Sequence, residues 1–154
     1  MDVKNVNPVL EAFAEIIPQI GFQSVQRVSV SLLEASIDNI GVMANIGVLG
    51  PLKGCILISM SLESAKRFAS AMMMGMQVLE FDSLAQSAIS EMANMVCAHS
   101  CTKFSRAGIA GLDISPPTLL IGEGGKVTLP MPKVIGVKFL IDGIDVDVFV
   151  GLIA

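Results

Sequence analysis

The sequence contains no tryptophan, no tyrosine and a single histidine, and charged residues make up only 16% of its 154 positions. Proteins that bind nucleic acids need lysine and arginine for the phosphates, and many also need aromatic rings on which bases can stack. This chain has no run of basic residues, its formal net charge is −4, and its pI is about 4.8. The composition therefore argues against a nucleic-acid-binding surface.

Uninterrupted hydrophobic runs are also missing, although hydrophobic residues make up 53% of the chain. The most apolar stretch, 134–154, is broken by Gly143 and by four charged residues, and each charge would cost about 2.5–3.5 kcal/mol at the centre of a bilayer. We therefore expect no membrane insertion. The excess apolar surface is better explained by a partner subunit, because soluble monomers rarely expose large apolar patches. The four charged residues are Lys138, Asp142, Asp145 and Asp147.

Few residues could ligate a metal or react as nucleophiles. Cys97 and Cys101 are one helical turn apart, but the single histidine, His99, would be rotated by about 200° from Cys97 on a helix and cannot join them as a ligand. We expect reduced, packed thiols, a buried His99, and no metal or other cofactor in this chain. The first eight residues lack the basic start and apolar core of a signal peptide, so the expected location is the cytoplasm.

Hydrophobic periodicity predicts one α+β domain over residues 1–154, in which helices cover an antiparallel sheet. Two hairpins are predicted, at Gly124-Gly125 and at Asp142-Gly143, because such dipeptides between β-rich runs form tight turns. Alternation places Asp145 and Asp147 on the solvent face of the second hairpin, as a solubilising edge rather than a cation site. The expected helices are 8–19, 62–74 and 83–106, and the expected strands are 24–33, 42–48, 52–60, 118–121, 127–129, 134–141 and 144–152.

The third expected helix is the longest, and signals mark both of its ends. Ser83 and Gln86 have the spacing of a capping box, and Asp82 adds negative charge near the helix start. Gly108 follows the expected end. The methionines that precede this helix, at 72–74 and 76, predict core or subunit packing, with a methionine-rich binding groove as the alternative.

Two faces of this long helix differ in character. Glu91 and Asn94 lie within about 60° of each other, so their side chains are neighbours. Ser87, Ser90 and Ala98 surround them, and these small residues would let the surface of another protein come close. On spacing alone, the pair also fits an ordinary solvated face. The expected buried face is mostly apolar and consists of Leu84, Ala88, Ile89, Met92, Met95, Val96 and His99.

Several segments occur in the order found in one known family. They are Val6-Asn7-Pro8, Met73-Met74-Gly75-Met76, Ser87-Ala88-Ile89, Glu91-Met92-Ala93-Asn94-Met95 and Asp113-Ile114-Ser115-Pro116-Pro117-Thr118. Together they resemble the CheX-type chemotaxis phosphatases of the CheC/CheX/FliY family, over nearly the whole chain. A single Glu-x-x-Asn pair fits the CheX type better than the two-site CheC type. One departure is Ala98-His99-Ser100, where many members have Gly-Asn-Ala.

This resemblance implies an α+β fold whose long helix presents the Glu-x-x-Asn pair, and a homodimer. It also implies hydrolysis of the aspartyl phosphate of a CheY-like response regulator. Asn94 would orient the attacking water, and Glu91 would contact the regulator's active-site lysine. Glu91, Ser87, Ser90 and Ala98 would form the contact surface, and Mg²⁺ would be held by the partner receiver domain rather than by this chain.

Two other functions fit the same sequence. The first is a non-catalytic adaptor of the same family that binds a receiver domain or a flagellar-switch component, and the altered segment 98–100 keeps this alternative open. The second is a purely structural dimer module. Asp113 is expected to bond its own backbone in a turn, and the segment 113–118 has no predicted chemical role.

Overall fold

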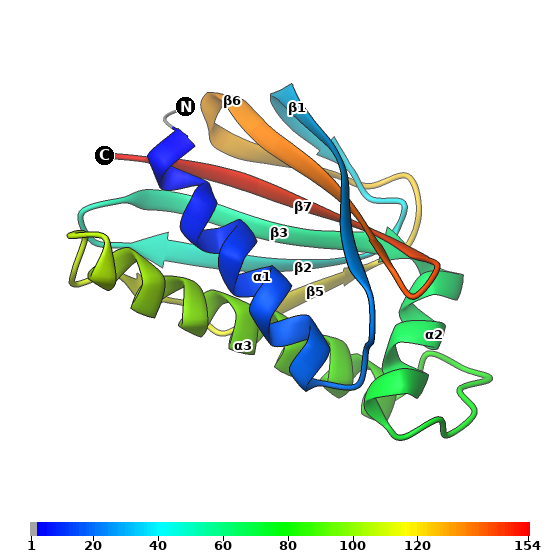
Figure 1. Cartoon of the computed structure of the whole chain (residues 1–154). Coiled ribbons are helices and arrows are strands. Elements are labelled where there is room, and N and C mark those ends of the chain that lie inside the picture. The colour runs from blue at the N-terminus through cyan, green and yellow to red at the C-terminus, as the bar shows by residue number, and fades with distance from the viewer. Residues whose placement is uncertain (1–2) are drawn as a thin grey trace.

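An antiparallel sheet of seven strands forms the frame of the molecule in the computed structural model, which describes residues 3–154 (Figure 1). The strands lie in the order β1-β6-β7-β3-β2, and both β4 and β5 pair with the outer edge of β2. The predicted α+β class with an antiparallel sheet is confirmed. The strands are β1 (Val25–Asp38), β2 (Gly41–Leu49), β3 (Lys53–Ser61), β4 (Asp113–Ile114), β5 (Thr118–Ile121), β6 (Lys126–Ile141) and β7 (Ile144–Ile153).

Helices α1 (Asn7–Gln19) and α3 (Ser83–Arg106) lie across one face of the sheet, and α2 (Leu62–Met72) packs near one end of it (Figure 1). A short 3-10 helix, Val3–Asn5, precedes α1. The three predicted helices are confirmed to within two residues at each end. The main core lies between this layer and the sheet, where the rings of Phe13 and Phe139 are 4.6 Å apart and those of Phe22 and Phe68 are 4.4 Å apart.

The start of α3 is fixed by Asp82 rather than by the predicted Ser83 cap. The Asp82 carboxylate accepts a hydrogen bond of 2.9 Å from the backbone N–H of Ala85. The Gln86 side chain donates to the carbonyl of Phe81, also at 2.9 Å. The predicted capping box is therefore wrong: the cap is Asp82, one position before Ser83, and Gln86 bonds to a carbonyl instead of a backbone N–H. The physical reason is that a carboxylate accepts from the helix N–H groups more strongly than a hydroxyl does.

One predicted hairpin is confirmed and the other is wrong. At Asp142-Gly143 the two residues have positive φ angles of 47° and 81°, and they join the paired residues Ile141 and Ile144. At Gly124-Gly125 the flanking strands do not pair with each other, because β5 joins β2 and the end of β6 joins β1.

The reason for the missing hairpin is the buried Asn39 in the turn between β1 and β2. Its backbone bonds to Gly124 and Gly125, its side chain donates to the carbonyl of Leu120 at 3.0 Å, and it accepts from the N–H of Gly41 at 3.0 Å. These bonds fasten the glycine loop to the β1–β2 turn instead of folding it back on itself.

The second face of the sheet carries a smaller core, beside the stretch where β1 and β6 shift register near Glu34. This core contains Ile37, Met43, Leu57, Leu129, Met131 and Val134. The prediction that Asp145 and Asp147 lie at a sheet edge is wrong, since β7 lies between β6 and β3. Asp145 is exposed. Asp147 is half-buried, and its carboxylate lies 3.6 Å from Lys138, while burial raises the pKa of Asp147.

Among residues 3–154, no helix has both the length and the hydrophobicity needed to cross a membrane.

Candidate functional site

Helix α3 presents its small residues as well as its large apolar ones to the core. The predicted buried face is confirmed at Ile89, Met92 and Val96, whereas Ala88 and Met95 are only partly buried. Leu84 was expected in the core, and this prediction is wrong because its side chain is 57% exposed. The residues of α3 that are buried are Ala85, Ile89, Met92, Ala93, Val96, Cys97, Ser100 and Phe104.

The opposite side of α3 carries the two predicted site residues. Glu91 is exposed and Asn94 is half-buried. Neither side chain has a hydrogen-bond or ion-pair partner within residues 3–154, so the functional groups of both remain available to another molecule. The predicted placement of this pair on an accessible helix face is thus confirmed.

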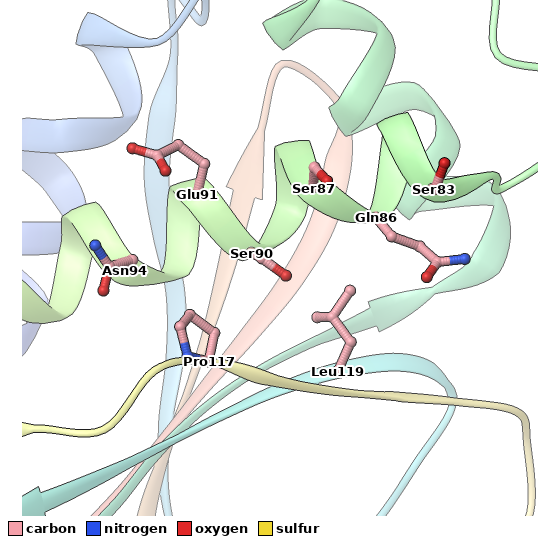
Figure 2. A pocket seen from close by; sticks show the side chains of 8 residues that line it. All are labelled: Ser83, Gln86, Ser87, Ser90, Glu91, Asn94, Pro117 and Leu119. Carbon is pink, nitrogen blue, oxygen red and sulfur yellow. The ribbon is translucent and has the colours of Figure 1, made fainter.

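Glu91 and Asn94 border an open hollow of about 560 Å³ between α3 and the segment that leads into β5 (Figure 2). Ser87 and Ser90, both predicted to lie near the pair, also line it. Ala98 is exposed on the same helix but does not reach the hollow. The full lining is Ser83, Gln86, Ser87, Ser90, Glu91, Asn94, Pro117 and Leu119.

Pro117 and Leu119 form the wall that faces α3 across this hollow (Figure 2). Leu119 is held by the pairing of β5 with β2, where it lies opposite Ala44. Just before Pro117, the backbone N–H of Ser115 donates to the carbonyl of Gly47, and the Ser115 hydroxyl accepts from the Gly47 N–H, both at 2.9 Å. The segment 113–118, which had no predicted role, therefore shapes the site.

Sequence reasoning missed four of the lining residues. Ser83 and Gln86 continue the helical row of Ser90 and Asn94 at spacings of three and four, so that spacing could have identified them. Pro117 and Leu119 could not be found in this way, because their position depends on the pairing of β5 with β2. Asp113 was expected to bond its own backbone, and its carboxylate does accept from the N–H of Ile114 at 3.0 Å.

The electrostatics of this face are acidic. No lysine or arginine occurs between Arg67 and Lys103, whereas Glu80, Asp82 and Glu91 all fall in this stretch. The Glu91 carboxylate therefore has no cation of its own on α3 near it. It could receive a cation from a second molecule, because an ionised carboxylate only accepts hydrogen bonds.

Further along α3, an ionic contact with α1 fixes the helix behind the site. The carboxylate of Glu15 lies 2.7 Å from His99 Nε2 and 2.7 Å from Lys103 Nζ. These hydrogen bonds lower the pKa of Glu15, and the bond to Glu15 raises the pKa of Lys103. His99 is therefore half-buried at the α1–α3 contact rather than in the core, where it was expected.

The departure at Ala98-His99-Ser100 is accommodated without disturbing the pair. Ala98 faces solvent, His99 bonds to Glu15, and the buried Ser100 hydroxyl donates to the carbonyl of Val96 at 2.7 Å. Of these three residues only His99 helps to attach α3 to α1, and none of them bonds to Glu91 or Asn94.

The cysteines lie away from the hollow. All three are free thiols, Cys97 is buried, and burial raises the pKa of its thiol well above the usual range. A raised pKa keeps a thiol protonated and therefore weakly nucleophilic. Among the described residues, no three histidine, cysteine or acidic side chains are grouped so that they could hold a metal ion.

Comparison with known proteins gives a consistent result. Residues 42–139, which include α2, α3 and strands β3 to β5, match the family described as chemotaxis phosphatase CheX. The CheY-P phosphatase CheX of Thermotoga maritima is 39% identical over 82 residues. That match covers 53% of this chain and 52% of the relative, so it spans about half the length of each.

Solved structures share the fold at lower identity. A CheC-like superfamily protein from Shewanella sp. PV-4 has a TM-score of 0.87 at 18% identity, with all of both chains covered. The structure of a CheX–CheY–BeF3–Mg²⁺ complex from Borrelia burgdorferi has a TM-score of 0.83 at 22% identity, covering 97% of this chain and 98% of that one.

Proposed function

This chain belongs to the CheX family of chemotaxis phosphatases, and on that premise we propose that it hydrolyses the aspartyl phosphate of a CheY-like response regulator. The observation that carries the proposal is the Glu91–Asn94 pair, which is accessible on a rigid helix beside an open hollow and has no partner within the described chain. The Thermotoga maritima relative is a CheY-P phosphatase, which agrees with this activity.

In this proposal, Asn94 orients the water that attacks phosphorus. An aspartyl phosphate is already reactive, and its hydrolysis depends mainly on a water held in line with the scissile bond. A side-chain amide can accept a hydrogen bond from that water and donate another to a phosphoryl oxygen. Small residues next to Asn94, such as Ser90, allow the partner's active site to approach the helix closely.

Glu91 anchors the partner rather than removing a proton. Its carboxylate is exposed and has no cation partner within residues 3–154, so the lysine of a receiver's active site can pair with it. General-base catalysis by Glu91 is not needed, because a loose phosphoryl-transfer transition state requires little early proton removal. The Mg²⁺ that neutralises the phosphoryl oxygens belongs to the receiver domain.

Phosphate release from a panel of phosphorylated receiver domains from the same genome would test this function directly. We expect Asn94→Ala to lower kcat by about 100-fold or more while KM stays nearly unchanged, because the variant still docks but no longer orients water. Glu91→Gln keeps the size of the side chain but removes its charge. We expect this variant to raise KM by about 10-fold or more, since a shielded ion pair is lost.

Phosphate release together with a direct binding measurement separates this function from its alternatives. A non-catalytic adaptor would bind a receiver without accelerating phosphate loss. A structural module would bind phosphorylated and unphosphorylated receivers equally, or neither. Wild-type rates of phosphate release in both variants would show that Glu91 and Asn94 are not the catalytic and partner-binding residues.

We also propose that the protein acts in the cytoplasm, as a homodimer. Support for the dimer comes from the edge strand β1, where Val28, Val30 and Leu32 are each more than half exposed. Such a row of apolar side chains on a sheet edge is unfavourable in water and is usually covered.

A further inference from the structure

Four exposed large hydrophobic side chains fall within eleven residues where α2 leads into α3. Met74 is 98% exposed, Leu79 72%, Met76 59% and Leu84 57%. This stretch lies at the end of the molecule where α3 begins (Figure 1). Single exposed apolar residues are common, but a concentration of them next to a functional site is typical of a contact surface.

Leu84 lies on the same side of α3 as Glu91. The two residues are seven positions apart, which on an α-helix is about 20° short of two full turns and a rise of about 10 Å. Ser87 lies between them on the exposed side. A protein surface that covers Glu91 and extends toward the start of the helix therefore meets Leu84.

The charges around this apolar stretch indicate what kind of partner fits it. Glu80 and Glu91 are exposed and have no ion pair within residues 3–154, and Asp82 caps the helix. Lys66 and Arg67 of α2 border a different hollow, together with Gly75 and Gln77. The border of this apolar surface is therefore basic on the side of α2 and acidic on the side of α3. The acidic side complements a partner surface that carries a basic residue.

The Glu91–Asn94 pair alone offers too little contact to hold another protein. Specific complexes bury about 1,200 Å² or more, and a few large side chains provide most of their binding free energy. Toward the end of α3, the exposed row continues with Ala98, Thr102 and Ser105, which are small. Large exposed apolar side chains are found only toward the start of the described helix, at Leu84 and in the loop before it.

We propose that Leu84, with Leu79 and Met76 of the preceding loop, forms an apolar anchor for the receiver domain. This is the same receiver domain whose phosphorylation site contacts Asn94 and Glu91 in the proposed function. This inference rests on the proposed function and adds an orientation to it. The receiver lies along α3 with its phosphorylation site over Asn94, and an apolar part of its surface extends toward the start of the helix. The anchor supplies affinity and takes no part in the chemistry.

The test compares Leu84→Ala with Leu49→Ala in steady-state phosphate release from a receiver that a small phosphodonor keeps phosphorylated. Leu49 is a matched control, because it is also an exposed leucine (66%) but lies at the end of β2 next to β4. We expect Leu84→Ala to raise KM about ten-fold with kcat unchanged, since Leu→Ala removes buried apolar surface at the interface. Leu79→Ala should raise KM in the same direction, and Leu49→Ala should leave it unchanged.

Binding to a receiver loaded with BeF3⁻ and Mg²⁺ provides a second readout that needs no turnover. We expect the dissociation constant of Leu84→Ala to rise by about the same factor as its KM. If Leu84→Ala and Leu79→Ala both bind and turn over like wild type while Asn94→Ala is inactive, the anchor is refuted and the phosphatase function stands. If wild type accelerates phosphate loss from no receiver in the panel, both proposals fail.

Discussion

Among individual residues, the small ones determine how closely a partner can approach the Glu91–Asn94 pair. Ser87 and Ser90 line the hollow beside Glu91 and Asn94, and Figure 2 shows the Ser90 side chain on the side of Pro117 and Leu119. An amide can orient water in another protein's active site only if its backbone comes within a few ångströms of that site. Side-chain size at Ser87 and Ser90 should therefore limit catalysis even though neither hydroxyl takes part in the reaction.

Ser87→Leu tests this steric requirement. Because Ser87 is exposed, the larger side chain projects into solvent in the free protein and leaves its stability nearly unchanged. We expect kcat/KM for a phosphorylated receiver to fall by about ten-fold or more, since misplacement of the reacting groups by about 1 Å is costly. The measurement is phosphate release at a subsaturating concentration of phosphorylated receiver. Thermal unfolding of the variant measures its stability.

Ser105→Leu is the control for that substitution. It lies eighteen residues further along α3, which is five full turns, so it points in the same direction about 27 Å away. Ser105 is exposed and outside the hollow. Equal activity losses in the two variants would contradict a local steric effect at the site.

Among the secondary-structure elements, α3 shows both what the sequence can predict and where prediction stops. Its bounds follow from apolar periodicity, a polar cap and Gly108, all of which are local. The prediction of its buried face was wrong at Leu84. The helix packs through small residues such as Ala85, Ala93 and Ser100, which a ranking by hydrophobicity overlooks. Small residues allow close helix packing, and that geometry depends on the neighbouring elements.

The wall of the site illustrates the same limit for strands. The sequence predicts β5 as a strand but not that it pairs with β2, because the pairing depends on the distant Asn39 and on Ser115 binding Gly47. Pro117 and Leu119 therefore reach the site only through contacts between segments far apart in the chain. In contrast, the Glu91–Asn94 pair is set by helical spacing alone and was predicted correctly as an accessible pair.

The contact between α1 and α3 predicts a pH-dependent stability. The bonds from Lys103 and His99 lower the pKa of Glu15 in the folded protein, so this carboxylate stabilises the fold above its unfolded pKa. That contribution is lost as the pH falls through the lowered folded pKa. We expect Glu15→Gln to lower Tm at pH 7, and we expect the difference from wild type to shrink as the pH falls below about 4, where an unperturbed glutamate titrates.

Thermal unfolding of both proteins from pH 3 to pH 7 measures this effect. Glu63→Gln on α2 is a suitable control, because Glu63 is exposed and lies 3.7 Å from Lys66 in a contact within one helix. We expect this control to change Tm little, since exposed pairs of this kind contribute little. A Tm difference between Glu15→Gln and wild type that stays constant over the whole range would contradict the assigned contact.

At the level of the whole molecule, the sheet separates two exposed surfaces that lie at its opposite edges. The side of α3 that carries Glu91 lies beside β5, near one edge of the sheet, whereas β1 forms the other edge. Val30 lies opposite Val137 and Leu32 lies opposite Ile135, and both partners on β6 contact the main core. Since directly opposite residues of an antiparallel pair share a face, Val30 and Leu32 extend the apolar face of the sheet beyond its helical cover.

A second copy of the chain covering β1 would leave the Glu91–Asn94 face of each copy open, and Val30→Asp tests that arrangement. A two-fold interface contains each residue twice, so burying this aspartate would place two charges in an apolar contact. We expect the wild type to have twice the 16.2 kDa chain mass and the variant to dissociate at about 100-fold higher concentration. Light scattering coupled to size exclusion over a dilution series measures both, with Leu49→Asp as the exposed control. Because α3 lies away from β1, a monomeric Val30→Asp protein should keep its kcat, and a dimer as stable as wild type would show that β1 is not the interface.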